Sequence, residues 1–122
     1  MMHEIDLPTM LRETGAVREG HFRLSSGLHS PKYVQCARLL EHPSDASRIG
    51  RELGERIRHL QPQRIIAPAL GGLIIGYAVA EALGIPMIFT ERKEGMMQLR
   101  RDFELGSHPR VVIVEDVVTT GK

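Results

Sequence analysis

The sequence has 122 residues, of which 42% are hydrophobic and 25% charged, and its formal net charge is +1. This length fits one domain, and the composition excludes a disordered chain. A net charge near zero argues against nucleic acid as a partner, because a nucleic-acid-binding surface usually needs a cluster of basic side chains.

The sequence carries no sign of a membrane-spanning or secretory segment. Its longest apolar stretch, residues 73–80, is too short to cross a bilayer and is interrupted by Gly76. The N-terminus has neither the basic region nor the apolar run of a signal peptide. We therefore expect a cytoplasmic protein with no membrane partner.

Cysteine and histidine do not indicate a metal site. Cys36 is the only cysteine, so an internal disulfide is excluded and a small buried residue is the simplest interpretation. The six histidines include no pair at the spacing typical of metal ligands. We expect no metal held directly by protein side chains.

Two elements are expected at the N-terminal end of the chain. Within residues 7–17, apolar residues recur at helical spacing and a glycine follows, which predicts a short helix. Residues 20–36 contain two short alternating runs separated by the turn-rich segment 25–31, which predicts a β-hairpin.

The clearest helix is expected over residues 43–60, with Ser44 as its N-cap. Charged residues of both signs flank an apolar stripe, and they predict a solvated outer face. The stripe consists of Ile49, Leu53, Ile57 and Leu60.

Residues 64–72 predict a strand that runs into a glycine turn, followed by a helix over residues 73–83 that stops at Gly84. Glycines at such a turn let backbone amides approach a phosphate closely, and the following helix N-terminus adds positive potential. On its own, this turn is equally well an anion-binding loop or an ordinary tight connection.

Residues 86–90 predict a further strand, parallel to the previous one because a helix connects them. A charged stretch follows at residues 91–105. It can be interpreted as a charged surface hairpin, or as a mobile basic loop that closes over a polyanion and excludes water.

The most informative stretch is residues 111–122. Its first four residues are β-branched and predict a strand buried on both faces, which Glu115 and Asp116 then follow. Residues 119–122 have the composition of a turn that opens a helix, where free amides can surround a phosphate. A sugar phosphate suits both features. The alternative is a Rossmann-type strand that happens to end in acids.

Residues 111–122 closely resemble the phosphoribosyl-diphosphate (PRPP) signature of type I phosphoribosyltransferases. Within that superfamily, the segment with Phe22, Leu24, Ser26-Gly27, Ser30-Pro31 and Tyr33 resembles the N-terminal part of orotate phosphoribosyltransferases. The resemblance implies transfer of the phosphoribosyl group of PRPP to orotate, with Mg²⁺ as the cofactor carried by PRPP and a homodimer as the assembly.

The resemblance also implies site residues. The catalytic residues would be Glu115, Asp116 and Lys93. The PRPP-binding residues would be Ala69, Leu70, Gly71, Gly72, Arg92, Lys93, Glu115, Asp116, Val117, Val118, Thr119, Thr120, Gly121 and Lys122. The orotate-binding residues would be Ser25, Ser26, Tyr33, Val34 and Thr119.

The sequence departs from the family pattern in two places. Many members have lysine where this chain has Ser25, and the lysine and histidine usual in the charged loop are missing, so Arg100 and Arg101 are candidate replacements. Another base phosphoribosyltransferase and a PRPP-sensing regulator remain as alternatives. The N-terminal Ser-Gly and Ser-Pro segment favours orotate over both.

The expected fold class is α/β, of the type I phosphoribosyltransferase (Rossmann-like) kind. It has a parallel central sheet flanked by helices, with an N-terminal helix and β-arm over the base site. We expect one domain over residues 1–122, with a base-covering segment at 1–42 and an α/β core at 43–122. An apolar strand such as 111–114 needs cover on both faces, and family members continue past this motif, so we expect the C-terminal part to be missing.

Overall fold

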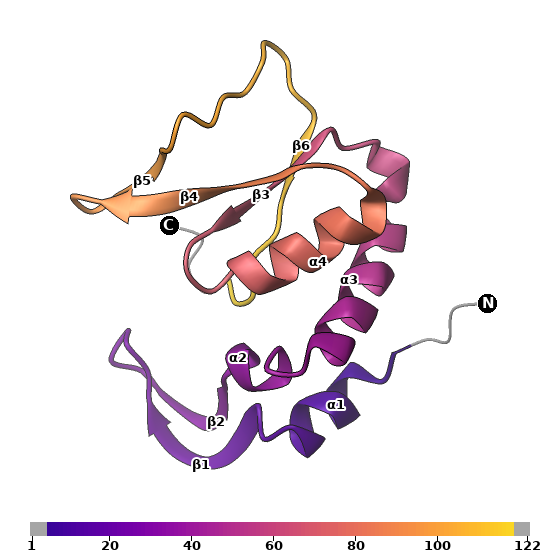
Figure 1. The fold of residues 1–122 in the computed structure, drawn as a ribbon. Coiled ribbons are helices and arrows are strands. Elements are labelled where there is room, and N and C mark those ends of the chain that lie inside the picture. The colour runs from indigo at the N-terminus through magenta and orange to yellow at the C-terminus, as the bar shows by residue number, and fades with distance from the viewer. Residues whose placement is uncertain (1–4, 119–122) are drawn as a thin grey trace.

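In the computed structural model, which describes residues 5–118, a hairpin and a short helix lie beside an α/β unit (Figure 1). The helices are α1 (Leu7–Glu13), α2 (Cys36–Leu39), α3 (Pro43–Ile57), the 3₁₀ turn η1 (Arg58–Leu60) and α4 (Leu73–Leu83). The strands are β1 (Val17–Arg23), β2 (His29–Val34), β3 (Arg64–Pro68), β4 (Met87–Lys93), β5 (Met96–Leu99) and β6 (Val111–Ile113).

The larger sheet has the strand order β5-β4-β3-β6. Strands β4 and β6 both pair in parallel with β3, so Ile65 lies beside Met87 on one side and Val112 on the other. This confirms the expected parallel core. Strand β5 pairs antiparallel with β4, so the sheet is mixed. The charged stretch after residue 90 therefore begins as a hairpin, which agrees with its interpretation as a surface hairpin rather than a mobile loop.

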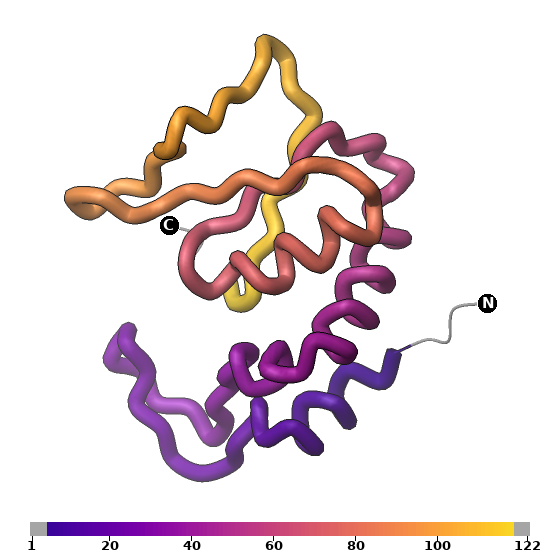
Figure 2. Tube along the Cα trace, viewed as in Figure 1, coloured from indigo at the N-terminus to yellow at the C-terminus, as the bar shows by residue number. Residues whose placement is uncertain are grey.

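Helix α4 packs directly on the sheet because Gly76 has no side chain. A Cβ atom at Gly76 would lie 2.7 Å from the Cβ of Ala67 on β3. Helix α3 packs in turn along α4 (Figure 2). The core between these layers contains the fully buried side chains of Ile65 and Val79. The apolar faces that strand and helix periodicity predict therefore pack together in one core.

Helix α4 has the predicted bounds, and its end at Gly84 is confirmed. Gly84 has a φ of 69°, and its amide donates to the carbonyls of Ala80 and Glu81. Glycine adopts this left-handed conformation at no steric cost, which explains why the helix stops there.

The predicted N-cap of α3 is wrong. The helix begins at Pro43 and its N-cap is His42, which makes no side-chain capping hydrogen bond. The fixed φ of proline suits the first helical position, so the cap falls two residues earlier than a serine-based rule places it. Leu60, the last residue of the predicted stripe, lies in η1 and is 50% exposed.

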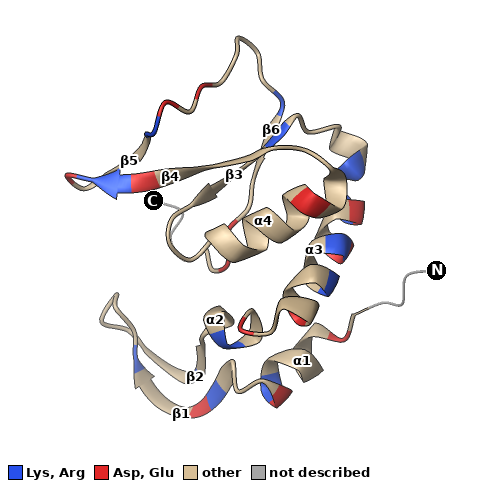
Figure 3. Cartoon of the chain, in the orientation of Figure 1, with Lys and Arg blue, Asp and Glu red and all other residues tan. Residues whose placement is uncertain are grey.

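The charged face of α3 is solvated, as expected. Arg56 pairs with Glu52 at 3.0 Å, and Arg58, the first residue of η1, pairs with Glu55 at 2.7 Å. Figure 3 shows residues of both charges along α3. Such pairs stabilise a helix only slightly because water and ions screen them.

Burial of the last strand on both faces is not observed within residues 5–118. Val112 and the following Val114 pack into the core, but Ile113 is 71% exposed. Strand β6 is an edge strand in this sheet, and the helices α3 and α4 cover the face opposite to Ile113.

The N-terminal segment forms the expected helix and hairpin, with a short additional helix, α2. Asp6 caps α1 by accepting a hydrogen bond from the amide of Thr9. The amide of Gln35 donates to the carbonyl of Ala16 at 2.7 Å, which closes the base of the hairpin. No helix among the described residues combines the length and hydropathy needed to cross a membrane.

We predict that Gly50→Ala destabilises the fold even though alanine favours helices. A Cβ atom at Gly50 would lie 2.6 Å from the backbone carbon of Ala78, so α3 and α4 would have to separate. Overpacking of this kind typically costs about 1–3 kcal/mol, which exceeds the gain of about 1 kcal/mol in helix propensity.

Gly54→Ala is the matched control in the same helix. There the nearest atom, the Cβ of Ala82, is 3.3 Å away, and a small shift accommodates the new methyl group. Urea unfolding of both variants measures the difference. Equal or greater stability of Gly50→Ala would contradict the close helix contact.

Candidate functional site

The glycine turn after β3 contacts the end of β6. A Cβ atom at Gly71 would lie 2.8 Å from Oδ1 of Asp116, and one at Gly72 would lie 3.0 Å from the carbonyl oxygen of Val114. At Gly72 the close atoms include backbone, so a side chain there would force the backbone to shift. At Gly71 they belong to the carboxylate end of the Asp116 side chain, so a side chain there would displace that carboxylate. The expected juxtaposition of the glycine turn with the acidic pair is confirmed.

The acidic pair is held in place by its own backbone. The amide of Asp116 donates to Oε1 of Glu115 at 2.8 Å, and the amide of Val117 donates to Oδ1 of Asp116 at 2.8 Å. Both carboxylates are half-buried. Burial raises the pKa of Glu115, and the adjoining Asp116 carboxyl group raises it further through a hydrogen bond and charge repulsion.

The glycine turn also offers backbone amides. The amides of Ala69 and Gly72 already donate to the carbonyls of Thr90 and Pro68, respectively. Within residues 5–118, the amides of Leu70 and Gly71 have no protein acceptor. The peptide bond between Ala69 and Leu70 is cis. Two amide donors thus remain at the turn, where the carboxyl ends of β3 and β6 meet, and they can receive an anion.

Arg92 and Lys93 lie at the end of β4, one strand further along the sheet. Successive side chains of a strand point to opposite faces, so these two cations cannot point to the same side of β4. Arg92 donates to the carbonyl of Gly95 in the β4–β5 turn at 2.9 Å. Both side chains are exposed.

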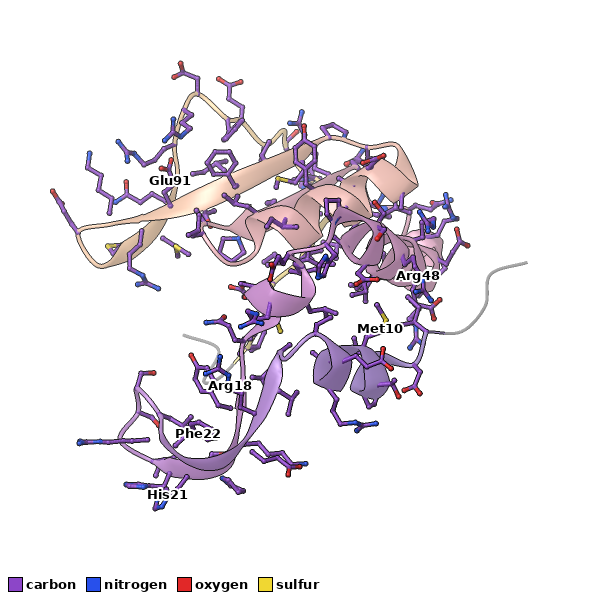
Figure 4. All side chains as sticks on the ribbon, turned by 60° about the horizontal axis from the view of Figure 1, so that its bottom comes forward. Met10, Arg18, His21, Phe22, Arg48 and Glu91 are labelled. Atoms are coloured by element: carbon purple, nitrogen blue, oxygen red, sulfur yellow. The ribbon has the colours of Figure 1, made fainter. Side chains whose placement is uncertain are left out.

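Arg101 contacts two side chains of β4. Its guanidinium donates to both carboxylate oxygens of Glu91, at 2.9 and 3.0 Å, and lies 5.7 Å from the ring centre of Phe89. Figure 4 labels Glu91 on β4. The bidentate contact lowers the pKa of Glu91. Arg101 therefore links the segment after β5 to β4, and its role as a replacement loop cation stays a prediction.

The N-terminal segment reaches the site through Cys36. Its thiol contacts the carbonyl oxygen of Asp116 at 3.7 Å, which links the start of α2 to the acidic pair. Burial and the nearby Asp116 carboxylate both raise the pKa of the Cys36 thiol. Sequence reasoning missed this contact, because a lone cysteine gives no long-range signal.

Four of the five residues expected at the base site lie on the hairpin that precedes Cys36, and the fifth is Thr119. Ser25 and Ser26 are in its exposed tip, and Ser26 accepts a hydrogen bond from the amide of Leu28 at 3.3 Å. Tyr33 packs against Phe22 with ring centres 5.6 Å apart, and Val34 is 43% exposed. None of the described hydrogen bonds joins these residues to the acidic pair. Thr119, Thr120, Gly121 and Lys122 lie outside the described residues.

A separate apolar groove of about 670 Å³ runs along α4, and its lining does not include Gly71 or Asp116. Exposed apolar side chains such as Ile74 and Tyr77 border it. The mostly apolar lining of this groove suits an apolar binding partner rather than a phosphate.

The chain was compared with families and proteins of known identity. No family model matches it. It is 44% identical over 120 residues to the orotate phosphoribosyltransferase of Desulforamulus reducens, and 46% identical over 119 residues to that of Nitratiruptor sp.. These matches cover 98% and 96% of the chain, which spans 63% and 59% of the two relatives.

Among solved structures, the orotate phosphoribosyltransferase of Aeropyrum pernix is 31% identical with a TM-score of 0.73, over 94% of this chain and 67% of that one. The α/β architecture with its mixed sheet is thus that of the type I phosphoribosyltransferases. The chain belongs to the orotate phosphoribosyltransferase family.

We predict that Glu115→Gln stabilises the ligand-free protein at neutral pH. The raised pKa of Glu115 means that the folded state loses stability as pH rises from the ordinary glutamate pKa to the raised one. A neutral glutamine removes that loss. The gain in Tm should be largest near pH 7 and should shrink at about pH 4 and below, where the wild-type carboxyl group is protonated as well.

Thermal unfolding across this pH range, with Glu13→Gln as a control on the exposed surface of α1, measures the effect. A Glu115→Gln variant that is less stable than wild type at neutral pH would show that the carboxylate stabilises the fold instead.

Proposed function

We propose that the protein is an orotate phosphoribosyltransferase that transfers the phosphoribosyl group of PRPP to orotate. The products are orotidine 5′-monophosphate and diphosphate, and the reaction belongs to pyrimidine (UMP) biosynthesis. The observation that carries the proposal is the contact between the Gly71 turn and the Asp116 carboxylate. This contact brings the amides of Leu70 and Gly71, which have no protein acceptor within residues 5–118, next to the acidic pair. Membership of the orotate phosphoribosyltransferase family supports the same proposal.

The reaction breaks the bond between the anomeric carbon and the diphosphate while a ring nitrogen of orotate attacks that carbon. Its transition state resembles an oxocarbenium ion, so alignment and charge placement supply most of the catalysis. Glu115 and Asp116 would hold the ribose hydroxyls and place negative charge beside the anomeric carbon. The ionised form of Glu115 is disfavoured in the ligand-free protein, as its raised pKa indicates. The positive charge that develops in the transition state would therefore stabilise this carboxylate more than an exposed one.

The leaving diphosphate would lie at the turn of residues 69–72, where the amides of Leu70 and Gly71 are free to donate within the described structure. Lys93 and Arg92 would add positive charge from the end of β4. Residues 119–122 would hold the 5′-phosphate, with Val117 and Val118 beside them in the PRPP site. The residues that would contact orotate are Ser25, Ser26, Tyr33, Val34 and Thr119.

Mg²⁺ is part of the proposal. No group of three or more His, Cys, Asp or Glu side chains in residues 5–118 is arranged to hold a metal ion. The oxygen donors nearby are the carboxylates of Glu115 and Asp116, and oxygen is the ligand type that Mg²⁺ prefers. They fit an ion that enters with PRPP and is held largely by substrate oxygens. When bound, Mg²⁺ would neutralise charge on the diphosphate.

A homodimer and a cytoplasmic location are proposed as well. The exposed apolar side chains along α4, including Ile74 and Tyr77, support an interface with a second copy. Light scattering across a range of protein concentrations tests the dimer.

The function is tested by incubating the purified protein with PRPP, Mg²⁺ and one base at a time. Orotidine 5′-monophosphate should form from orotate, and omission of Mg²⁺ should reduce its formation. Turnover of uracil or adenine with orotate inert would instead indicate another phosphoribosyltransferase. Binding of PRPP without turnover of any base would favour a sensing role.

We predict that Asp116→Asn lowers kcat by about two to three orders of magnitude, the usual cost of removing one positioned charge in a transition state. Its amide keeps the shape of the side chain, so the circular dichroism spectrum and Tm should stay near wild type. Glu13→Gln, a change of the same kind on exposed α1, should leave kcat unchanged. Wild-type kinetics for Asp116→Asn would refute the assigned role.

A further inference from the structure

Two histidines from the two strands of the N-terminal hairpin, His21 and His29, meet on its outer face. Nε2 of His21 lies 2.6 Å from Nδ1 of His29, and the two rings meet edge to face with centres 4.7 Å apart. Both side chains are exposed. Figure 4 shows His21 on the opposite face of the hairpin from Phe22. The pair is therefore separate from the face that carries the Phe22–Tyr33 contact.

A β-bulge creates this meeting. The pairing of β1 with β2 shifts by one residue between Glu19 and Phe22, and His21 lies within that irregularity. Bulges commonly redirect a side chain in this way. If the register of residues 17–19 continued, His21 would lie opposite Ser30 and point to the other face of the hairpin from His29. The shifted register instead makes the two histidines diagonal neighbours on one face. The bulge points both rings at one spot.

The space around the pair is a shallow depression of about 360 Å³, lined by Gly20, His21, His29, Ser30 and Pro31. Its lining contains no carboxylate. Arg23 lies opposite His29 in the strand register. The positive charge of Arg23 opposes the binding of any cation at this face, so only a metal that bonds strongly to imidazole nitrogen suits the pair.

We propose that His21 and His29 form a binding site for a nitrogen-preferring divalent cation of the Zn²⁺ type, with water filling the remaining positions. Metal–nitrogen bonds of about 2.0–2.1 Å at a tetrahedral angle require the two nitrogens to be about 3.3 Å apart. Since the side chains are exposed, small torsional changes open the pair by less than 1 Å, about the required amount.

Such an ion would connect β1 to β2 on the outer face of the hairpin. It would stabilise the strand pairing that supports the residues on the inner face. The competing explanation of the short distance is a single hydrogen bond in which one ring donates and the other accepts. That arrangement makes no use of a metal.

The test uses tag-free protein, treated with a chelator and then titrated with ZnCl₂ in a calorimeter. We expect one Zn²⁺ per chain, accompanied by a rise in Tm. His21→Gln and His29→Gln should each weaken binding at least about tenfold, since each removes one of two protein ligands. The matched control is His59→Gln, an exposed histidine in η1, and it should bind Zn²⁺ as wild type does.

A second measurement follows the imidazole ¹⁵N resonances during the titration, which reports on the rings even if a variant is less stable. Selective shifts of His21 and His29 would support the site. Absence of Zn²⁺ binding in the wild type, or retention of full affinity in both variants, would overturn it and leave only a hydrogen-bonded pair. None of these readouts depends on phosphoribosyl transfer.

Discussion

The structure depends on one close contact, in which the backbone of Gly71 lies against the carboxylate of Asp116. Strands β3 and β6 are neighbours in the sheet, so the segments that leave their carboxyl ends compete for the same space. A methyl group on Gly71 would reach within 2.8 Å of the carboxylate, and one on Gly72 would press on the backbone of Val114. Two glycines remove this conflict. Within residues 5–118, the turn also leaves the amides of Leu70 and Gly71 without a protein acceptor beside the acids, a combination that suits a phosphorylated sugar.

This arrangement concentrates charge where water is partly excluded. Glu115 carries a raised pKa because burial and Asp116 both disfavour its ionised form. An acidic pair of this kind does not stabilise the ligand-free fold, so its presence is better explained by function than by folding. The Cys36 thiol, which contacts the carbonyl of Asp116, shows that the N-terminal segment shares in forming this environment. The site thus draws on the first helices as well as on the sheet.

Much of the α/β unit could be predicted from the sequence, because its elements have strong local signals. The strand–turn–helix at residues 64–83 is predicted by an apolar run, two glycines and the helix stop at Gly84. The meeting of Gly71 with Asp116 followed from resemblance and from the rule that parallel strands end at one edge. Features that depend on tertiary context were missed. Ile113 is exposed because β6 is an edge strand of the described sheet, and the His21–His29 pair exists only because a bulge shifts the register of the hairpin.

The central claim is tested most directly by calorimetric titration of PRPP, with Mg²⁺ present, into Gly71→Ala and wild-type protein. The added methyl group would displace the Asp116 carboxylate from its place beside the turn, so the affinity for PRPP should fall at least about tenfold, or about 1.4 kcal/mol. Gly106→Ala serves as the control, since a Cβ atom there meets nothing within 4 Å. Equal PRPP affinity in wild type and both variants would contradict the account, because the glycine turn and the acidic pair would then not share a ligand.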